Sequence, residues 1–339
     1  MASFKIGFIG AGSQALEQMK TIHFSRLGTL AAVCDPNIGR AIQAGRTYQI
    51  PYFSSYQNMI AQTDLDAVFI CTPHNSHFAA ASYALTHQLH VIKEKPFACT
   101  VTEGQELVEL ARRNQKSLIT VMQRRYHECY QTGKELLKSI GDPFFFRGSY
   151  SFNGGPYDFG WRGIKSIAGG GAILDMGYHM IDLIIWYLGL PTQVYAQMSN
   201  IARPDVSYET EDTATLSFRI NHQLIGTLDL TRASQPKEEQ IYVHATKGTL
   251  YANRYNLIIY NLDGSVRTHV KINQDWSVSI QKQIDHFIEN ALNGKIDDGS
   301  SHLPHLHLVE AAYRSSQLGE PVFVYTNPFW LAGHARKAK

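Results

Sequence analysis

The chain has 339 residues, a formal net charge of +2 at pH 7 and 44% hydrophobic residues. This composition is that of an ordinary globular protein with enough length for two domains. No long basic run and no uninterrupted apolar run of about 18 residues occurs, so neither a nucleic-acid nor a membrane partner is favoured. The first residues enter a strand pattern directly, without a signal segment, and the cytoplasm is the expected location.

The sequence does not predict a metal site. The four cysteines, which are widely separated and lack C-x-x-C spacing, are Cys34, Cys71, Cys99 and Cys129. They indicate neither a disulfide framework nor a zinc cluster. His74 and His77 form an H-x-x-H pair, and His302, His305 and His307 form a second group, but no complete ligand set has a defined spacing.

The first strand pattern leads into a nucleotide-binding fingerprint. Phe4–Ile9 is apolar and ends in Gly10-Ala11-Gly12-Ser13-Gln14-Ala15, a G-x-G-x-x-A turn followed by an amphipathic stretch over residues 16–27. Gly10 permits a tight turn, and Gly12 lets a pyrophosphate approach the positive end of the following helix. Ala15 keeps that helix close to the strand. The pattern therefore predicts dinucleotide binding.

A second strand, residues 30–34, ends at Asp35, which can accept hydrogen bonds from a ribose 2′-hydroxyl. A 2′-phosphate would lie against this carboxylate, and Pro36 and Asn37 offer no compensating cation. Arg40 is the nearest one. NAD is therefore favoured over NADP.

The strand–helix alternation of a doubly wound sheet continues with strands expected at 67–71, 90–93 and 117–122 and helices at 77–87 and 103–113. Ligands collect beyond the carboxyl ends of such strands, where Thr72–His77 and Glu94-Lys95-Pro96 lie. Lys95 is either a solvated loop charge or, held in a Lys–Pro corner, a group that stabilises a substrate oxygen becoming an alkoxide. His77 is expected to cap the helix or to hold the nicotinamide end.

The segment Gly169–Asp182 predicts a helix that begins at three glycines and runs to about residue 188. At ~100° per residue, Asp175, His179 and Asp182 fall within roughly 60° of one another, opposite a wide apolar stripe. A carboxylate–imidazole pair on a rigid helix is suited to proton transfer at a fixed place. The alternative is an Asp–His pair that only solvates an exposed face.

The rest of the chain predicts a largely antiparallel sheet with helices on one face. A helix is expected at 128–140 and others at 279–292 and 306–318, with no repeats and a frayed basic tail at His334–Lys339. The expected strands are 144–150, 193–197, 212–220, 224–231, 240–245, 257–262 and 266–272. Because an uncovered sheet face with aromatic residues is a liability in a monomer, we expect a homo-oligomer, a dimer or tetramer, formed through this sheet.

These features together resemble the glucose–fructose oxidoreductase/inositol dehydrogenase (Gfo/Idh/MocA) family over nearly the whole chain. The residues that carry the resemblance are Gly10-Ala11-Gly12, Asp35, Thr72-Pro73, His77, Glu94-Lys95-Pro96, Arg125-Tyr126, Trp161-Arg162, Gly169-Gly170-Gly171, Asp175, Gly177, His179, Asp182, Trp186, Gly189 and Thr246–Leu250. Two departures are Ser13-Gln14-Ala15-Leu16 after the fingerprint, which leaves the phosphate contacts unassigned, and Ala245 where a glycine is common.

The resemblance implies an α/β Rossmann domain that binds NAD (residues 1–123) and an α+β domain with an open, largely antiparallel sheet for substrate binding and oligomerisation (124–339). The expected cofactor-binding residues are Gly10, Ala11, Gly12, Ser13, Gln14, Asp35, Thr72, Pro73, Asn75, His77, Glu94, Lys95, Trp161 and Arg162. Lys95, Asp175 and His179 are the expected catalytic residues, and together with Arg125 and Asp182 they are expected to bind the substrate.

The implied activity is that of an NAD(P)-dependent dehydrogenase (EC 1.1.1 type), which transfers a hydride between nicotinamide and a hydroxyl or carbonyl carbon of a sugar, sugar derivative or inositol. An alternative is a glycoside hydrolase or lyase that uses bound NAD as an internal redox relay. A non-enzymatic NAD-sensing protein would need the dinucleotide site but not Lys95, Asp175 and His179 together.

Overall fold

The computed structural model describes residues 3–324, and the chain forms two compact units. Unit 1 takes the chain up to Glu128, the short segment Ser166–Gly169 and the later segment Asn273–Leu303. Unit 2 takes Cys129–Lys165, Gly170–Ile272 and the chain from residue 304 onward. The expected frayed tail at His334–Lys339 lies outside the described residues.

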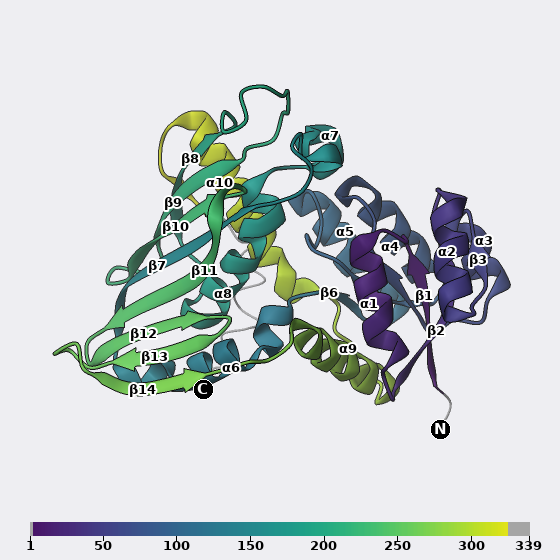
Figure 1. Cartoon of the computed structure of the whole chain (residues 1–339), viewed down its shortest axis with the longest axis horizontal. Helices are drawn as coiled ribbons and strands as arrows, with labels where there is room; N and C mark the ends of the chain where they lie inside the picture. The colour runs from purple at the N-terminus through teal and green to yellow at the C-terminus, as the bar shows by residue number, and fades with distance from the viewer. Residues whose placement is uncertain (1–2, 325–339) are drawn as a thin grey trace. The chain divides into compact units, whose positions relative to one another are not determined.

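Unit 1 contains a six-stranded parallel sheet. Its strands are β1 (Phe4–Ile9), β2 (Gly28–Cys34), β3 (Tyr52–Phe53), β4 (Ala67–Ile70), β5 (His90–Lys93) and β6 (Leu118–Thr120). They lie in the order β3-β2-β1-β4-β5-β6, and every pair is parallel (Figure 1). The order reverses between β1 and β4, and in sheets of this kind the crevice outside the strand ends at the reversal binds dinucleotides. The expected doubly wound Rossmann architecture is confirmed.

The helices of unit 1 begin and end near the expected residues, with two differences. They are α1 (Ser13–His23), α2 (Ile38–Tyr48), α3 (Tyr56–Gln62), α4 (His77–Thr86), α5 (Val101–Asn114) and α9 (Trp276–Leu292), with 3₁₀ turns η1 (His74–Ser76), η2 (Gln123–Tyr126) and η6 (Ser300–His302). First, α1 starts inside the fingerprint, three residues before the expected residue 16. Second, no element was expected over residues 38–62, where α2, β3 and α3 complete the crossovers between β2 and β4.

Helix α9 returns to unit 1 from late in the chain. Its buried side chains, among them Ile284, Phe287 and Ile288, join the apolar core of the sheet. The rings of Phe4 and Phe287 pack edge to face, with their centres 6.1 Å apart. Gly28 of β2 lies so close to α9 that a Cβ added there would be 2.9 Å from Cδ1 of Ile288. The expected division at residues 123/124 assigned this helix to the second domain, but its apolar face completes the first core. The assignment of a separate function to each domain remains a prediction.

Unit 2 contains a nine-stranded sheet. Its strands are β7 (Pro143–Asn153), β8 (Gln193–Ser199), β9 (Thr213–Arg219), β10 (Ile225–Thr231), β11 (Ala233–Ala245), β12 (Gly248–Asn253), β13 (Asn256–Tyr260), β14 (Val266–Lys271) and β15 (Val322–Phe323). They lie in the order β14-β13-β12-β11-β7-β10-β9-β8-β15, and all neighbours are antiparallel except β10 and β7 (Figure 1). The largely antiparallel sheet is confirmed. Strands β12 and β15 were not among the expected strands.

Helices pack on one face of this sheet. They are α6 (Glu128–Leu136), α8 (Tyr178–Leu188) and α10 (Leu303–Leu318), with the 3₁₀ turn η3 (Leu137–Ile140) and a π-helical turn, η5 (Ile173–Gly177). Unit 2 also contains the 3₁₀ turn η4 (Gly160–Gly163), whereas the short α7 (Lys165–Ala168) belongs to unit 1 from Ser166 onward. A Cβ on Gly177 would lie 2.4 Å from Cδ1 of Leu230, so the junction of η5 and α8 lies against β10. Ser315 of α10 accepts a hydrogen bond from the backbone of Ala196 on β8 at 3.0 Å.

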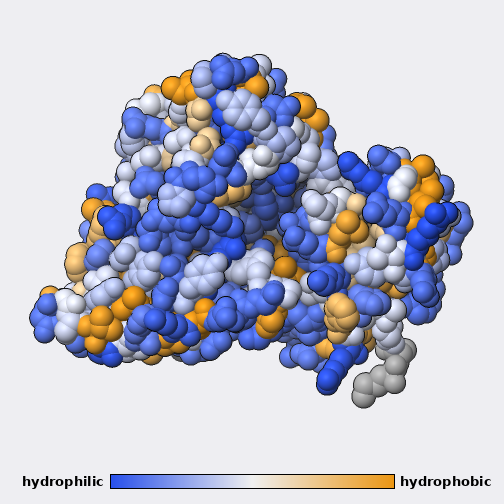
Figure 2. All heavy atoms as spheres, viewed as in Figure 1, coloured by the Kyte–Doolittle hydropathy of each residue, from blue (hydrophilic) through white to orange (hydrophobic). Residues whose placement is uncertain are grey.

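Hydrophilic side chains dominate the face drawn in Figure 2, with hydrophobic ones in scattered patches. Among residues 3–324, no helix combines the length and the apolar character needed to cross a membrane. The four cysteines are free thiols, and Cys34 and Cys129 are buried.

Candidate active site

The fingerprint turn has the geometry that a dinucleotide needs. Gly10 has φ +102°, and a Cβ there would lie 2.3 Å from the carbonyl oxygen of Cys71, so only glycine fits. Gly12 is the N-cap of α1, has no side-chain cap, and would place a Cβ in open space. The first turn of α1 carries no acidic residue. Backbone N–H groups at this helix end are therefore suited to a phosphate.

Asp35 follows β2, and its side chain is hydrogen-bonded both to the fingerprint turn and to the loop after β2. Its Oδ2 accepts a hydrogen bond from the backbone N–H of Ala11, and its Oδ1 accepts one from that of Asn37, each at 2.8 Å. Only 8% of the residue is exposed. Because each carboxylate oxygen has a second lone pair, the side chain can still accept from ribose hydroxyls. The residues present thus fit the adenosine end of a dinucleotide.

The segment after β4 is held by its own hydrogen bonds. Ser76 donates to Oγ1 of Thr72 at 2.7 Å, and Nε2 of His77 donates to the carbonyl of Thr72 at 2.9 Å. Burial lowers the pKa of His77 well below its usual value. The charges of Lys93 and His74 act in the same direction, while hydrogen bonding to backbone carbonyls opposes them. His77 is therefore a neutral imidazole that orders this segment.

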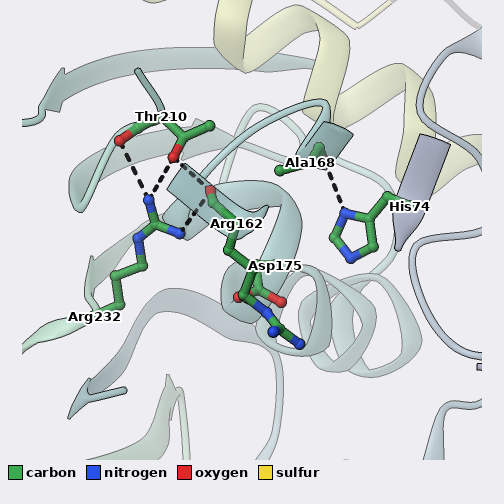
Figure 3. Close-up of polar contacts among 6 residues, drawn as sticks. All are labelled: His74, Arg162, Ala168, Asp175, Thr210 and Arg232. Atoms are coloured by element: carbon green, nitrogen blue, oxygen red, sulfur yellow. Dashed lines mark hydrogen bonds and ion pairs between the residues drawn. The ribbon is translucent and has the colours of Figure 1, made fainter. Parts of the chain in front are cut away.

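Two neighbouring positions of the same segment differ in exposure. Asn75 is exposed, whereas His74 is only 4% exposed and donates from Nδ1 to the carbonyl of Ala168 at 2.7 Å (Figure 3). Ala168 belongs to the short segment Ser166–Gly169 of unit 1, at the start of the helix predicted from Gly169–Asp182. His74 thus anchors this segment within unit 1.

The Glu-Lys-Pro corner follows β5. Oε1 of Glu94 accepts a hydrogen bond from Nε2 of Gln18 on α1 at 2.8 Å, which ties the corner to the fingerprint helix. Lys95 is half-buried and is followed by a cis peptide bond to Pro96. The corner thus places Lys95 at the carboxyl end of the sheet, on the edge where the fingerprint also lies.

The segment Gly169–Asp182 differs from the expected continuous α-helix. Residues 173–177 form a π-helical turn, and α8 begins only at Tyr178. The angle expected between Asp175 and His179 assumed a uniform α-helical pitch and does not apply across this junction. Asp175 is 8% exposed and His179 is 9% exposed. The alternative in which the pair only solvates an exposed face is therefore excluded.

The π-helical turn is held by a carboxylate that sequence reasoning missed. Glu211 accepts hydrogen bonds from the backbone N–H groups of Gly171 and Ile173 at 2.8 and 3.0 Å, and Tyr313 donates to it at 2.8 Å. A Cβ on Gly171 would lie 1.9 Å from the carbonyl oxygen of Glu211, so glycine is required. Burial raises the pKa of Glu211, and these hydrogen bonds oppose the rise. No pattern near residue 211 indicated this role.

Asp175 lies beside a guanidinium. Nε of Arg162, in turn η4, is 3.1 Å from Oδ2 of Asp175 (Figure 3). The guanidinium carbon of Arg162 also lies 4.3 Å from the centre of the Trp161 ring. The Arg162 side chain is 40% exposed, whereas that of Asp175 is 11% exposed. An arginine next to a carboxylate attracts it and limits its rotation. The structure therefore brings Trp161, Arg162 and Asp175 together within unit 2.

A buried arginine holds the backbone of that turn. Nη2 of Arg232 donates to Oγ1 of Thr210 at 2.6 Å, and Nη1 donates to the carbonyl of Arg162 at 3.4 Å (Figure 3). The hydroxyl of Thr210 also donates to the same carbonyl at 2.7 Å. Burial lowers the pKa of Arg232, while the charges of Asp175, Glu211 and Asp212 oppose this. Arg232 and Thr210 were not among the predicted site residues, because neither belongs to a short motif.

Asp182 lies on α8 but is 1% exposed, and its Oδ1 is 2.9 Å from Nε2 of His305 on α10. This burial favours a supporting role over direct substrate contact. His302 instead stacks on Phe97 within unit 1, so the histidines near residue 305 do not converge. Among the described residues, no group of three His, Cys, Asp or Glu side chains could hold a metal ion.

The predicted site residues are divided between the two units. Those in unit 1 are Gly10, Ala11, Gly12, Ser13, Gln14, Asp35, Thr72, Pro73, Asn75, His77, Glu94, Lys95 and Arg125; those in unit 2 are Trp161, Arg162, Asp175, His179 and Asp182. Ser13 and Gln14 are exposed at the start of α1, and Arg125 is half-buried in turn η2. The roles of all these residues remain predictions.

The fold and the fingerprint turn define a dinucleotide-binding α/β protein with a second, antiparallel unit. Residues 4–122 match the family model described as "Oxidoreductase family, NAD-binding Rossmann fold", and residues 130–251 match the model of the GFO/IDH/MocA C-terminal domain. The chain belongs to the Gfo/Idh/MocA family of NAD-binding oxidoreductases.

Three similar proteins span most of the chain. D-apiose dehydrogenase of Rhizobium rhizogenes is 25% identical over 95% of this chain and 98% of its own length. D-xylose 1-dehydrogenase (NADP(+)) 2 of Haloferax volcanii is 25% identical over 86% of this chain and 91% of its own. A solved structure of levoglucosan dehydrogenase with NADH and levoglucosan has a TM-score of 0.88 at 20% identity, covers 96% of this chain and 100% of its own, and shares the fold.

Proposed function

We propose that this protein is an NAD-dependent dehydrogenase (EC 1.1.1 type) that oxidises a CH–OH group of a sugar, sugar derivative or inositol, or reduces the corresponding carbonyl. The observation that carries the proposal is the pairing of Arg162 with Asp175, four residues before His179, in a chain that also has the dinucleotide fingerprint. Two similar proteins bear the names of pentose dehydrogenases. These names favour a dehydrogenase over a hydrolase or lyase with a redox relay.

NAD supplies a hydride acceptor when it is bound. In our assignment, His179 takes the hydroxyl proton, and the ammonium of Lys95 stabilises the negative charge that develops on the same oxygen. Asp175, which pairs with Arg162, orients the imidazole or binds a neighbouring hydroxyl. In the reductive direction the same groups return the proton.

Within the nucleotide site, Asp35 supports the choice of NAD over NADP. Asp35 accepts hydrogen bonds from two backbone N–H groups, which hold its carboxylate in place. The negative charge of this carboxylate would repel the additional 2′-phosphate of NADP. The NADP-linked xylose dehydrogenase among the similar proteins shows that cofactor choice is a point of difference between such enzymes. Thr72, Pro73, Asn75, His77 and Glu94 are assigned to the nicotinamide end.

The outward face of the unit 2 sheet supports the proposed homo-oligomer. This face is formed by the residues that alternate along the strands with the buried core positions, and it carries a cluster of aromatic and cationic side chains. The ring centres of Tyr242 and Tyr251 are 4.7 Å apart, and the guanidinium carbon of Arg147 lies 5.1 Å from the centre of the Tyr242 ring. Phe145 stacks on His244 on the same face at 5.7 Å. Burial of such a face against a second copy would remove apolar area from water. Light scattering of wild type and Tyr242→Asp tests this, and a monomeric wild type at micromolar concentration would contradict it.

The function is tested by reduced-nicotinamide absorbance with NAD⁺ and a panel of D-apiose, D-xylose, levoglucosan, myo-inositol, amino sugars and sugar acids. We expect absorbance to grow with one class of compound and to be lost in Lys95→Met and His179→Ala. A matched control is Lys282→Met, an exposed position on α9. If NADH binds in a fluorescence titration but no compound yields reduced cofactor, the dehydrogenase assignment fails and the redox relay becomes the better explanation.

A further inference from the structure

A second lysine lies two residues before Lys95 and points into the interior. Lys93 ends β5 and is 0% exposed. Its Nζ donates to the carbonyl oxygens of Pro96 and Phe97, at 2.7 Å each, and lies 5.9 Å from the centre of the Phe97 ring. A buried amine is costly unless it is hydrogen-bonded, and here two adjacent carbonyls accept two of its N–H groups.

These two hydrogen bonds close a small loop around Lys95. The chain leaves β5 at Lys93, passes through Glu94 and Lys95, and returns so that the next two carbonyls meet the Lys93 amine. Glu94 is fixed separately by Gln18. The backbone of Lys95 therefore lies between two anchored points, one before it and one after it.

We propose that Lys93 is a positioning residue for Lys95: by holding the Pro96 and Phe97 carbonyls it fixes the direction in which the Lys95 ammonium points. Lys93 itself cannot contact a substrate, because its side chain has no exposed surface. The inference rests on the proposed function, in which Lys95 stabilises the substrate oxygen. It assigns a role to a residue that none of the sequence motifs included.

The surroundings of Lys93 support this role at the pH of the cell. Burial lowers the pKa of Lys93 to about 7, against the opposing charges of Cys99, Glu103 and Glu94. The charge of Lys93 also lowers the pKa of the neighbouring His77, as does that of His74. A neutral amine retains two N–H bonds, so it can donate to both carbonyls on either side of this pKa. The positioning effect is therefore expected to persist across the neutral range.

The test is a double-mutant cycle of Lys93→Met and Lys95→Met, with Lys282→Met as the exposed control. Methionine has a similar length and shape but no donor. We expect Lys93→Met to lower kcat by about tenfold or more, as small displacements of a catalytic group do, and to leave the Kd of NADH within about twofold. In the Lys95→Met background, Lys93→Met should lower kcat by less than about twofold, because residues that act through one another are not additive.

Two further measurements separate positioning from general stability. Hydrogen exchange of the Phe97, Ala98 and Cys99 amides should become faster in Lys93→Met, while that of β1 stays unchanged. Lys93→Gln retains an N–H₂ donor on a slightly shorter chain, and its kcat should lie above that of Lys93→Met at a similar thermal midpoint.

The possible outcomes are distinct. A kcat of Lys93→Met equal to wild type, an equal loss of kcat in both backgrounds, or equal loss in Lys93→Gln and Lys93→Met would overturn the positioning role and leave the proposed function intact. An unchanged kcat in Lys95→Met would overturn the proposed function itself, and the inference with it.

Discussion

Nε of Arg162 lies 3.1 Å from Oδ2 of Asp175, and the guanidinium is the more exposed of the two groups. The carboxylate of Asp175 therefore has a charged partner on its solvent side. The turn that carries Asp175 is held by Glu211, which accepts hydrogen bonds from the backbone N–H groups of Gly171 and Ile173. An Asp–His pair needs such constraints to transfer a proton at one place. The ion pair joins turn η4 to turn η5 through two residues that lie 13 positions apart in the sequence.

The first prediction concerns this pair. Arg162→Met should lower kcat by roughly 10- to 100-fold, because Asp175 loses the group that limits its rotation and balances its charge. The Kd of NADH should change by less than about threefold. Steady-state kinetics and NADH fluorescence titration measure the two effects. A variant with wild-type kcat and a weakened Kd would mean that Arg162 acts on the cofactor alone.

The second prediction concerns the buried arginine behind that turn. Arg232→Met should lower the free energy of unfolding by about 2–4 kcal/mol, because the carbonyl of Arg162 and the hydroxyl of Thr210 lose a buried charged donor. Urea denaturation measures the loss, and Arg219→Met, an exposed position on β9, is the control. Equal stability of the two variants would contradict the structural importance of Arg232.

The third prediction concerns cofactor choice. Asp35→Ala should weaken NAD binding and narrow the preference for NAD over NADP by about tenfold or more, since the carboxylate that repels a 2′-phosphate is removed. The ratio of kcat/KM for the two cofactors measures this preference. Asp64→Ala, an exposed carboxylate of unit 1, should leave the ratio unchanged. An unchanged ratio in Asp35→Ala would remove the reason for choosing NAD.

The fourth prediction concerns stability against pH. Burial lowers the pKa of Lys93 to about 7 from a usual 10.5, so between these values the unfolded chain binds a proton that the native chain does not. The contribution of Lys93 to stability therefore rises as pH increases through this window. Relative to Lys93→Met, wild type should gain up to about 1.4 kcal/mol per pH unit there. Urea denaturation of both proteins between pH 6.5 and 9.5 measures the difference, and parallel curves would show that the native amine stays protonated.

The sequence predicted the elements whose signals are local. The turn after β1 was visible because Gly10 and Gly12 are needed for backbone reasons that any such turn shares. Asp35 and the Lys95 corner were visible because both follow apolar strand patterns directly. The strands of the second unit were visible through their alternation, since one face of each is buried and the other is not.

Three features could not be predicted because they depend on contacts between distant segments. The π-helical turn around Asp175 forms where Gly171 lies against the backbone of Glu211, 40 residues later. Helix α9 joins unit 1 because Phe287 and Ile288 complete a core whose residues outside this helix lie more than 160 positions earlier in the sequence. The hydrogen bond from the buried Arg232 to the backbone carbonyl of Arg162 joins residues 70 positions apart in the sequence.

The sequence by itself determined the fold class and the family and singled out Lys95, Asp175 and His179 as candidate catalytic residues, because motifs and hydrophobic periodicity are properties of short segments. Only the tertiary structure decided how these groups are supported: Asp175 by Arg162 and a π-helical turn, Lys95 by a buried Lys93, and Asp182 by His305. The physical reason is that burial and hydrogen-bond partners are set by which segments pack together, and packing is a property of the whole chain.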